Sequence, residues 1–197
     1  YGPDSAELSE WVELYNASEE AISLAGWTLV WGTSDYSSEH ALSPVVLEPG
    51  VHYVISEEGT DGGDEPAVFG FGNATSTADA IQLRSADGSP HDTLIYGDDN
   101  PEGWLDNAGT VALSLAPKPR EGQSIGRHTD GVDVDRCGDD FVLFDDPTMG
   151  GINLMPIIDG DGDGDGDTDI DGDGDGDADA DDTAWMTSDC DPSGDIK

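Results

Sequence analysis

The sequence predicts an all-β protein, an immunoglobulin-like antiparallel β-sandwich followed by an extended acidic C-terminal tail. Short segments with strand composition recur along the first three quarters of the chain. Several alternate apolar with polar residues, the pattern of a half-buried strand, and no window of a dozen residues has helical periodicity. About seven short strands separated by turn signals are typical of an immunoglobulin-like sandwich.

The predicted strands are bounded by turn sequences. Residues 25–26 (Ala-Gly) precede the second strand and residues 48–50 (Glu-Pro-Gly) precede the third. Residues 86–88 (Ala-Asp-Gly) separate the fourth strand from the fifth, and residues 98–101 (Asp-Asp-Asn-Pro) follow the fifth. In chain order, the predicted strands are 11–15, 27–31, 51–55, 80–84, 93–96, 110–114 and 140–144.

Length and charge indicate one domain with an appendage. A chain of 197 residues with 35% apolar content can bury one core. We expect a sandwich over residues 1–153 and a tail over residues 154–197. The formal net charge is −39; residues 156–197 hold sixteen Asp and one Lys, which leaves −24 on the rest. Six scattered Lys and Arg residues exclude binding to nucleic acid or anionic membranes through a basic patch.

The excess of acid has two explanations that the sequence leaves open. One is an extracellular protein that works in millimolar calcium, and the other is a high-salt environment in which acidic surfaces keep proteins soluble. No apolar run approaches the roughly 18–20 residues of a membrane-spanning helix. No basic and then apolar leader begins at Tyr1. We therefore expect no membrane span, and an extracellular or cell-surface location with any signal already removed.

The tail predicts calcium binding. Every odd-numbered residue from Asp159 to Asp181 is aspartate, and calcium takes six to eight oxygen ligands. On an extended strand these carboxylates would lie roughly 6.5–7 Å apart on one face, too far apart for one strand to chelate an ion tightly. Two segments that share the ions would therefore be crosslinked. The alternative is a solvated, disordered linker. The template of a helix–loop–helix calcium loop fits only the frame from Asp171, and its flanks lack helical character. The predicted ligands are Asp159, Asp161, Asp163, Asp165, Asp167, Asp169, Asp171, Asp173, Asp175, Asp177, Asp179, Asp181 and Asp182.

Other motifs carry weaker signals. Cys137 and Cys190 could form a disulfide that pins the tail to the body; free thiols or an intermolecular bridge are the alternatives. Residues 122–126 match the Gly-x-Ser-x-Gly pattern of a nucleophile elbow, but the flanks lack the strand and helix that it requires. The four histidines, which we expect on the surface or in loops, have no zinc-site spacing. Asn16 and Asn73 begin formal N-glycosylation sequences.

A set of ordered landmarks resembles the lamin-tail domain in its bacterial and archaeal form. It begins with Glu-Trp-Val-Glu-Leu-Tyr-Asn at 10–16 and Leu-Ala-Gly-Trp-Thr-Leu at 24–29. Later landmarks follow in the family's order, so the resemblance covers about residues 7–153. It implies an immunoglobulin-like, non-catalytic module of secreted and cell-surface proteins, found beside enzymes, adhesive domains and calcium-rich repeats. The later landmarks lie at 47–55, 79–83, 86–88, 92–97, 124–127 and 146–153.

The landmark residues have structural interpretations. Gly26 makes a turn, and Glu13 and Asn16 satisfy backbone groups near it. We expect Trp11, Trp27 and Leu83 to be largely buried; Leu14 and Leu29 are further core residues.

One departure from the family concerns the first strand. Family members usually begin with an apolar strand ending in Ile-Asn-Glu, and this sequence starts after it. The sandwich then has an open edge, a template for strand addition by a neighbouring subunit or a distant part of the chain. Residues 152–158 are a candidate donor, although Pro156 interrupts the ladder. The alternative is that the sequence merely omits residues.

Together these observations predict a non-enzymatic extracellular structural protein, a calcium-dependent subunit of a surface assembly or filament that self-associates through calcium and strand addition. The first alternative is an accessory or adhesion module of a larger secreted hydrolase, with the acidic run as a linker. A solitary calcium-buffering or adhesive domain is the third interpretation.

Overall fold

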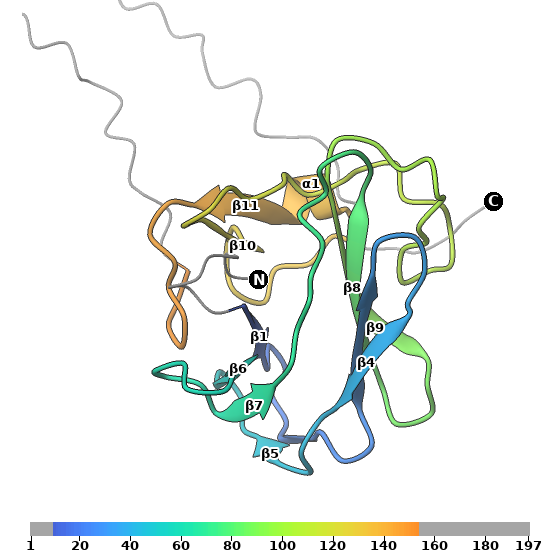
Figure 1. Ribbon diagram of the computed structural model, residues 1–197. Coiled ribbons are helices and arrows are strands. Elements are labelled where there is room, and N and C mark those ends of the chain that lie inside the picture. Colours follow the sequence, from blue (N-terminus) through green and yellow to red (C-terminus); the bar gives the residue numbers. More distant parts are fainter. Residues whose placement is uncertain (1–9, 154–197) are drawn as a thin grey trace, which may run out of the picture. The chain divides into compact units, whose positions relative to one another are not determined.

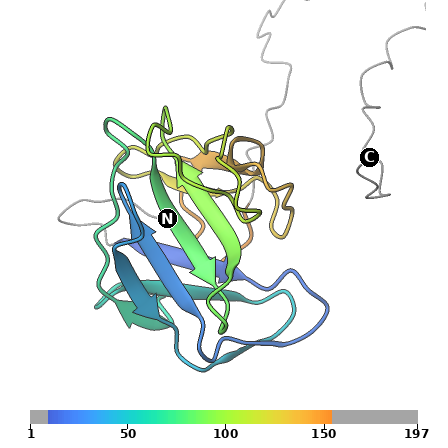
Figure 2. The same ribbon diagram turned by 90° about the vertical axis from the view of Figure 1, so that its right-hand side faces the viewer.

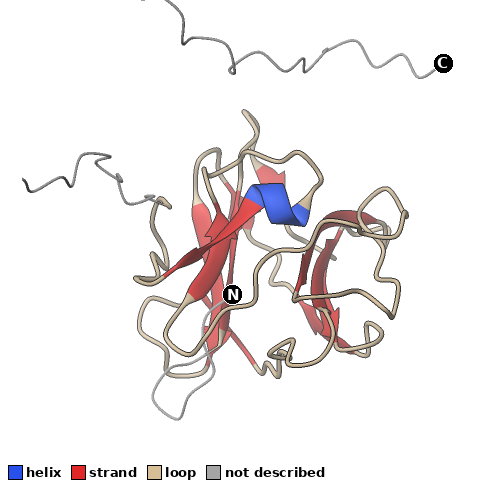
Figure 3. Cartoon of the chain, turned by 90° about the horizontal axis from the view of Figure 1, so that it is seen from above, coloured by secondary structure: helices blue, strands red, loops and turns tan. Residues whose placement is uncertain are grey.

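The strands form two layers that face each other across an apolar core (Figures 1 and 3). The computed structural model describes residues 10–153. Within this range no helix is long and apolar enough to cross a membrane. The one helix in residues 10–153 is the four-residue α1 (Cys137–Asp140).

One layer is a four-stranded antiparallel sheet in the order β4-β3-β8-β9 (Figure 2). Leu29 pairs with Leu83 across its centre, and a register shift follows Leu83 where β8 meets β9. Consecutive residues are buried in the middle of β3 (29–31) and at the start of β8 (79–82), so both faces of the sheet are covered there. Their bounds are β3 (Thr28–Gly32), β4 (Ser38–Ala41), β8 (Asp79–Arg84) and β9 (Pro90–Tyr96).

The facing layer consists of smaller sheets. A three-stranded sheet has the order β1-β6-β7, with β1 antiparallel and β7 parallel to β6. Two further strand pairs are antiparallel: β10 with β11, and β2 with β5. Figure 1 shows β10 and β11 above β1 and β6, on the same side of the four-stranded sheet. The bounds are β1 (Trp11–Tyr15), β2 (Ile22–Ser23), β5 (Val46–Leu47), β6 (His52–Glu57), β7 (Glu65–Ala67), β10 (Ser124–Arg127) and β11 (Phe141–Phe144).

The core between the layers is built from aliphatic and aromatic side chains. Ile55 of β6 and Ile95 of β9 are completely buried, so each layer contributes to the same core. The ring of Trp31 packs edge-on against Phe69 and Phe71 at 5.5 and 5.4 Å between centroids. Full burial of one such side chain stabilises the fold by roughly 1.5–3 kcal/mol.

The predicted fold class is confirmed, and most predicted strands are present. The segment 11–15 forms β1, and the predicted strands near 27–31, 51–55, 80–84, 93–96 and 140–144 form β3, β6, β8, β9 and β11 with small shifts. Gly26 has the positive φ of +81° that its turn requires. Trp11 is buried, as predicted.

One expectation about the body is wrong. The segment 110–114 forms one bridge, from Val111 to Leu105, because Asp106 accepts hydrogen bonds from the backbone and hydroxyl of Thr110 and folds a tight turn there. Trp27 and Leu83 pack against the core, in line with the prediction, and part of each side chain lines a cleft. The pairs between these strands are antiparallel except for β6 with β7, which is parallel.

Glu65 is a buried carboxylate that connects the two layers. It lies on β7, and its Oε2 accepts a hydrogen bond of 2.7 Å from the hydroxyl of Tyr53 on β6. Its Oε1 lies 2.6 Å from Nε2 of His40 on β4, in the opposite sheet. The backbone N–H of Ser43 donates to both oxygens. Burial alone would raise the pKa of Glu65, but these hydrogen bonds outweigh it and hold the pKa below its usual value.

Replacing Glu65 with alanine should destabilise the protein by about 3 kcal/mol, because Tyr53 and Ser43 lose their buried acceptor. The control is Glu58→Ala, which removes an exposed carboxylate next to the same sheet. Urea denaturation of the three proteins gives the free energies of unfolding. Equal urea midpoints for wild type and Glu65→Ala would show that this carboxylate does not hold the two layers together.

The contribution of Glu65 should also depend on pH. Its pKa is lower in the folded protein than in the unfolded chain, so its stabilisation is complete above the unfolded value of about 4.3. That stabilisation is lost as the pH falls through the lower folded value. The difference in unfolding free energy between wild type and Glu65→Gln should therefore be constant near neutral pH and shrink below about pH 4. A difference that grew with acidification would contradict this assignment.

Candidate functional site

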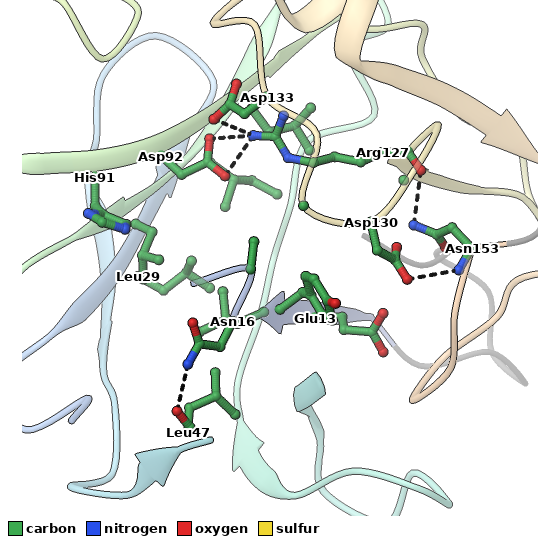
Figure 4. Close-up of a pocket in the computed structure, with 18 of the residues that line it drawn as sticks. Glu13, Asn16, Leu29, Leu47, His91, Asp92, Arg127, Asp130, Asp133 and Asn153 are labelled. Carbon is green, nitrogen blue, oxygen red and sulfur yellow. Dashed lines mark hydrogen bonds and ion pairs between the residues drawn. The ribbon is translucent and has the colours of Figure 1, made fainter. Parts of the chain in front are cut away.

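A cleft of about 550 Å³ lies between the two layers, at the gap between β1 and β10 (Figure 4). We call it the edge cleft. Its floor includes Leu29, Ile81 and Leu94 of the four-stranded sheet. Its two walls are strands. Residues 11 and 13–15 of β1 form one wall, and the whole of β10 forms the other. A surface lined by consecutive strand residues exposes main-chain groups as well as side chains.

The main chain of β1 points alternately to β6 and into the edge cleft. The carbonyl of Glu10 accepts from Glu57, and the N–H of Asn16 donates to the carbonyl of Val51, so even-numbered residues face β6. In an antiparallel ladder the intervening residues face the other way. The N–H and C=O groups of residues 11, 13 and 15 therefore point into the cleft, where the described part of the chain supplies no second strand.

On the opposite wall, the main chain of β10 also points alternately to its paired strand and into the edge cleft. The N–H of His128 donates to the carbonyl of Asp140, which places the hydrogen-bonded pairs of β10 and β11 at even-numbered positions of β10. The main chain of Ile125 and Arg127 then faces the edge cleft. The carbonyl of Arg127 accepts a hydrogen bond of 3.0 Å from the side-chain amide of Asn153, which closes this end of the edge.

Arg127 is the centre of an ion-pair cluster at the cleft wall. One of its nitrogens lies 2.9 Å from both oxygens of Asp92 and 3.0 Å from Asp133. A second nitrogen lies 3.6 Å from Asp140, and the guanidinium stacks 4.6 Å from the ring of Phe141. Figure 4 shows Asp92 and Asp133 converging on the guanidinium.

Electrostatics explain why this cluster is stable although the side chain of Arg127 is only 14% exposed. Burial opposes its charge, but Asp92 and Asp133 outweigh burial and raise the pKa of the guanidinium. Burial alone would raise the pKa of Asp133, but hydrogen bonds from the Asp135 backbone and from Arg127 hold it below its usual range. Arg127 and Asp133 are therefore both charged at neutral pH.

A second group of polar residues closes the other side of the mouth. His52 lies 3.3 Å from Asp130, and the same carboxylate oxygen accepts from the N–H of Asn153 at 3.2 Å. Glu13 accepts a hydrogen bond from the N–H of Gly150. Burial raises the pKa of Glu13, an effect that this hydrogen bond partly offsets. Residues 150–153 are thus held against the cleft.

Residues with catalytic chemistry have structural roles here. Ser124 is 3% exposed and begins β10, a strand in the position where a nucleophile elbow needs a helix. His40 and His52 lie on strands, hydrogen-bonded to carboxylates, which corrects the expectation that they are surface or loop residues. Among residues 10–153, no group of three or more His, Cys, Asp or Glu side chains is arranged to hold a metal ion.

The predicted calcium ligands from Asp159 to Asp182 lie outside the described residues, so the calcium site stays a prediction. The predicted Cys137–Cys190 bridge does too, because Cys190 lies beyond residue 153. Cys137 is buried; its sulfur lies 3.3 Å from the carbonyl of Thr93 and 3.4 Å from the N–H of Ile95. Burial raises the pKa of this thiol to about 11.

The side chain of Asn16 binds backbone groups, which is the structural role that was expected of it. Its side-chain amide is buried and donates 2.8 Å hydrogen bonds to the carbonyls of Glu20 and Leu47. The carboxylate of Glu13 also binds a backbone group, but that group belongs to Gly150, far from the turn in sequence. The Arg127 cluster was not predicted, although a lone arginine among many carboxylates is a signal for such a pairing.

Replacing Arg127 with alanine should destabilise the body by about 2–3 kcal/mol, because the buried carboxylate of Asp140 is left without a counter-charge, whereas solvent screens the loss at Asp92 and Asp133. Arg127→Lys should recover only part of the loss, since lysine lacks the planar fork and the stacking. Arg136→Ala is the control; its side chain is 66% exposed, so its ion pair with Asp139 contributes about 1 kcal/mol or less. Equal urea midpoints for Arg127→Ala and Arg136→Ala would refute this role.

Comparison with known proteins supports part of the sequence interpretation. No curated protein matches the chain in sequence. The model of one family, the lamin tail domain, matches residues 1–98. This range contains β1 to β9, and the similarity of residues 99–153 stays a prediction. Residues 1–98 are thus similar to the lamin tail domain, a structural, immunoglobulin-like domain.

Proposed function

We propose that this protein is a non-catalytic structural subunit of an extracellular surface assembly or filament, which self-associates through calcium and through strand addition. The observation that carries the proposal is the edge cleft. Two strand edges with inward-facing main-chain groups flank an apolar floor, an arrangement that accepts an extended segment by β-augmentation. A hydrolytic site would instead need a nucleophile exposed beside a general base.

Charge supports the role of calcium. The net charge of −39 makes two copies repel each other strongly, and six basic residues cannot compensate it. Monovalent salt screens this repulsion over about 8 Å but does not link carboxylates. Calcium binds several carboxylates at once, and the twelve alternating aspartates from Asp159 to Asp181 supply them at regular spacing.

The alternative is an accessory or adhesion module of a secreted hydrolase, in which the acidic run is a linker. The lamin-tail similarity is compatible with both proposals, because a structural module serves in either setting. The two differ in calcium dependence, since a linker responds to charge screening and a crosslink needs a multivalent ion.

Analytical ultracentrifugation should show particles well above the 20.6 kDa chain in millimolar calcium, and smaller particles after chelation. The triple variant Asp171→Asn, Asp173→Asn and Asp175→Asn should reduce this assembly severalfold and leave the body folded. The matched control makes the same charge change at three exposed body positions: Asp35→Asn, Asp61→Asn and Asp146→Asn.

Monovalent salt at equal ionic strength separates screening from crosslinking. Assembly in sodium chloride equal to that in calcium, or a body triple that loses as much assembly as the tail triple, would refute calcium crosslinking. A particle of unchanged size under every condition would favour the linker interpretation.

A further inference from the structure

We infer that the strand that enters the edge cleft is the segment 154–158, donated by a second copy of this chain in a reciprocal exchange. The inference deepens the proposed self-association and rests on it. It names the segment, the surface that receives it and the strand edge that each of its residues faces. None of these steps involves calcium.

The cleft sets the length and backbone of its occupant. β1 presents inward main-chain groups at residues 11, 13 and 15, and β10 presents them at 125 and 127. An extended segment of about five residues spans this length at 3.3 Å per residue. Placed between the two edges, it would join β7-β6-β1 and β10-β11 into one sheet.

The cleft also selects the chemistry of its occupant. Its floor is apolar, and acidic groups such as Glu13 and Asp130 already line its mouth, so added carboxylates would be repelled. Outside the described residues, two stretches have five or more consecutive uncharged residues, 154–158 (Leu-Met-Pro-Ile-Ile) and 183–188 (Thr-Ala-Trp-Met-Thr-Ser). The first has four large aliphatic side chains in five positions, against two large apolar side chains in the second.

The position of Asn153 favours the first stretch. Its N–H donates to Asp130, and its side-chain amide donates to the carbonyl of Arg127 at the end of the open β10 edge. Asn153, the residue before this stretch, is therefore held at the mouth of the cleft. The other stretch is separated from Asn153 by the whole acidic run.

Pro156 decides the orientation of the pairing. Successive residues of a strand face opposite neighbours, so residues 155 and 157 face one edge and residues 154, 156 and 158 face the other. Proline has no N–H to donate. The edge with fewer open groups is β10, where Asn153 already occupies the Arg127 carbonyl. We therefore place Pro156 toward β10, with Met155 and Ile157 paired to β1.

The donor belongs to a second copy because a segment that filled its own cleft would leave no strand for the proposed self-association. Asn153 lies beside the cleft in each copy, so two copies that face each other through these mouths could exchange the adjoining segments over a short connection. Reciprocal exchange of an identical element is a low-cost route to a symmetric dimer.

Hydrogen exchange of the full chain in chelator tests this inference. Amides of residues 11, 13, 15 and 125 should exchange about tenfold more slowly at about 100 µM protein than at about 1 µM. Ile157→Asp should abolish this slowing by placing a charge in the cleft. Met155→Pro should also abolish it, by removing an N–H that faces β1. Leu113→Asp is the control, because it adds the same charge at a side chain that is 95% exposed and does not line the cleft.

Other outcomes overturn the exchange. Slowing that requires residues 154–158 but is independent of concentration would place the segment in the cleft of its own chain. Slowing that Ile157→Asp and Met155→Pro leave intact would exclude the segment. Because the measurement is made in chelator, it is separate from the calcium response of the Asp171, Asp173 and Asp175 variant. The strand-exchange prediction and the calcium prediction can therefore fail independently of each other.

Discussion

The fold of residues 10–153 depends on where this strongly acidic chain places its few positively charged side chains relative to its carboxylates. Of the five Lys and Arg residues in this range, Arg127 is the one placed among several carboxylates. It brings together β9, the loop after β10, and α1. The exposed pairs of Lys118 and Arg136 are worth little by comparison, because solvent screens them. One guanidinium thus fixes the orientation of β10, which forms a wall of the edge cleft.

Glu65 performs the complementary task on the other side of the sandwich. Its carboxylate is compensated by neutral donors, the hydroxyl of Tyr53 and the backbone of Ser43, together with His40. A negative charge can therefore be buried between the layers without one of the scarce basic residues. Both sites stabilise a charged side chain that is largely removed from solvent. At Arg127 several carboxylates surround a cation, and at Glu65 hydrogen-bond donors surround an anion.

The sequence predicted the fold where local pattern and tertiary pairing agree. Residues 11–15 alternate as a half-buried strand and form β1 over that range. Residues 38–41 (Ser-Glu-His-Ala) lack strand composition, and they form β4 because β3 pairs with them and His40 contacts Glu65. Residues 110–114 have strand composition, but the local turn at Asp106 prevails. Asp133 and Asp140 follow Arg127 closely in sequence, whereas Asp92 comes from β9. The sequence therefore shows acidic residues near the arginine, but not which of them the fold brings to the guanidinium, nor the cleft beside it.

The edge cleft and the acidity of the chain belong to one physical argument. An open strand edge above an apolar floor is a template for uncontrolled pairing, and proteins commonly protect such edges with charge. Here the protection is global as well as local: Glu13 and Asp130 line the mouth, and a net charge of −39 keeps copies apart. Under the proposed function this charge makes association conditional. Neutral, apolar segments of the same chain can enter the cleft once two bodies meet, which concentrated protein and monovalent screening allow for a pair of copies. Larger assemblies bring more negative charge together and need calcium to compensate it, so the repulsion that prevents indiscriminate aggregation gives calcium control over assembly beyond the pair.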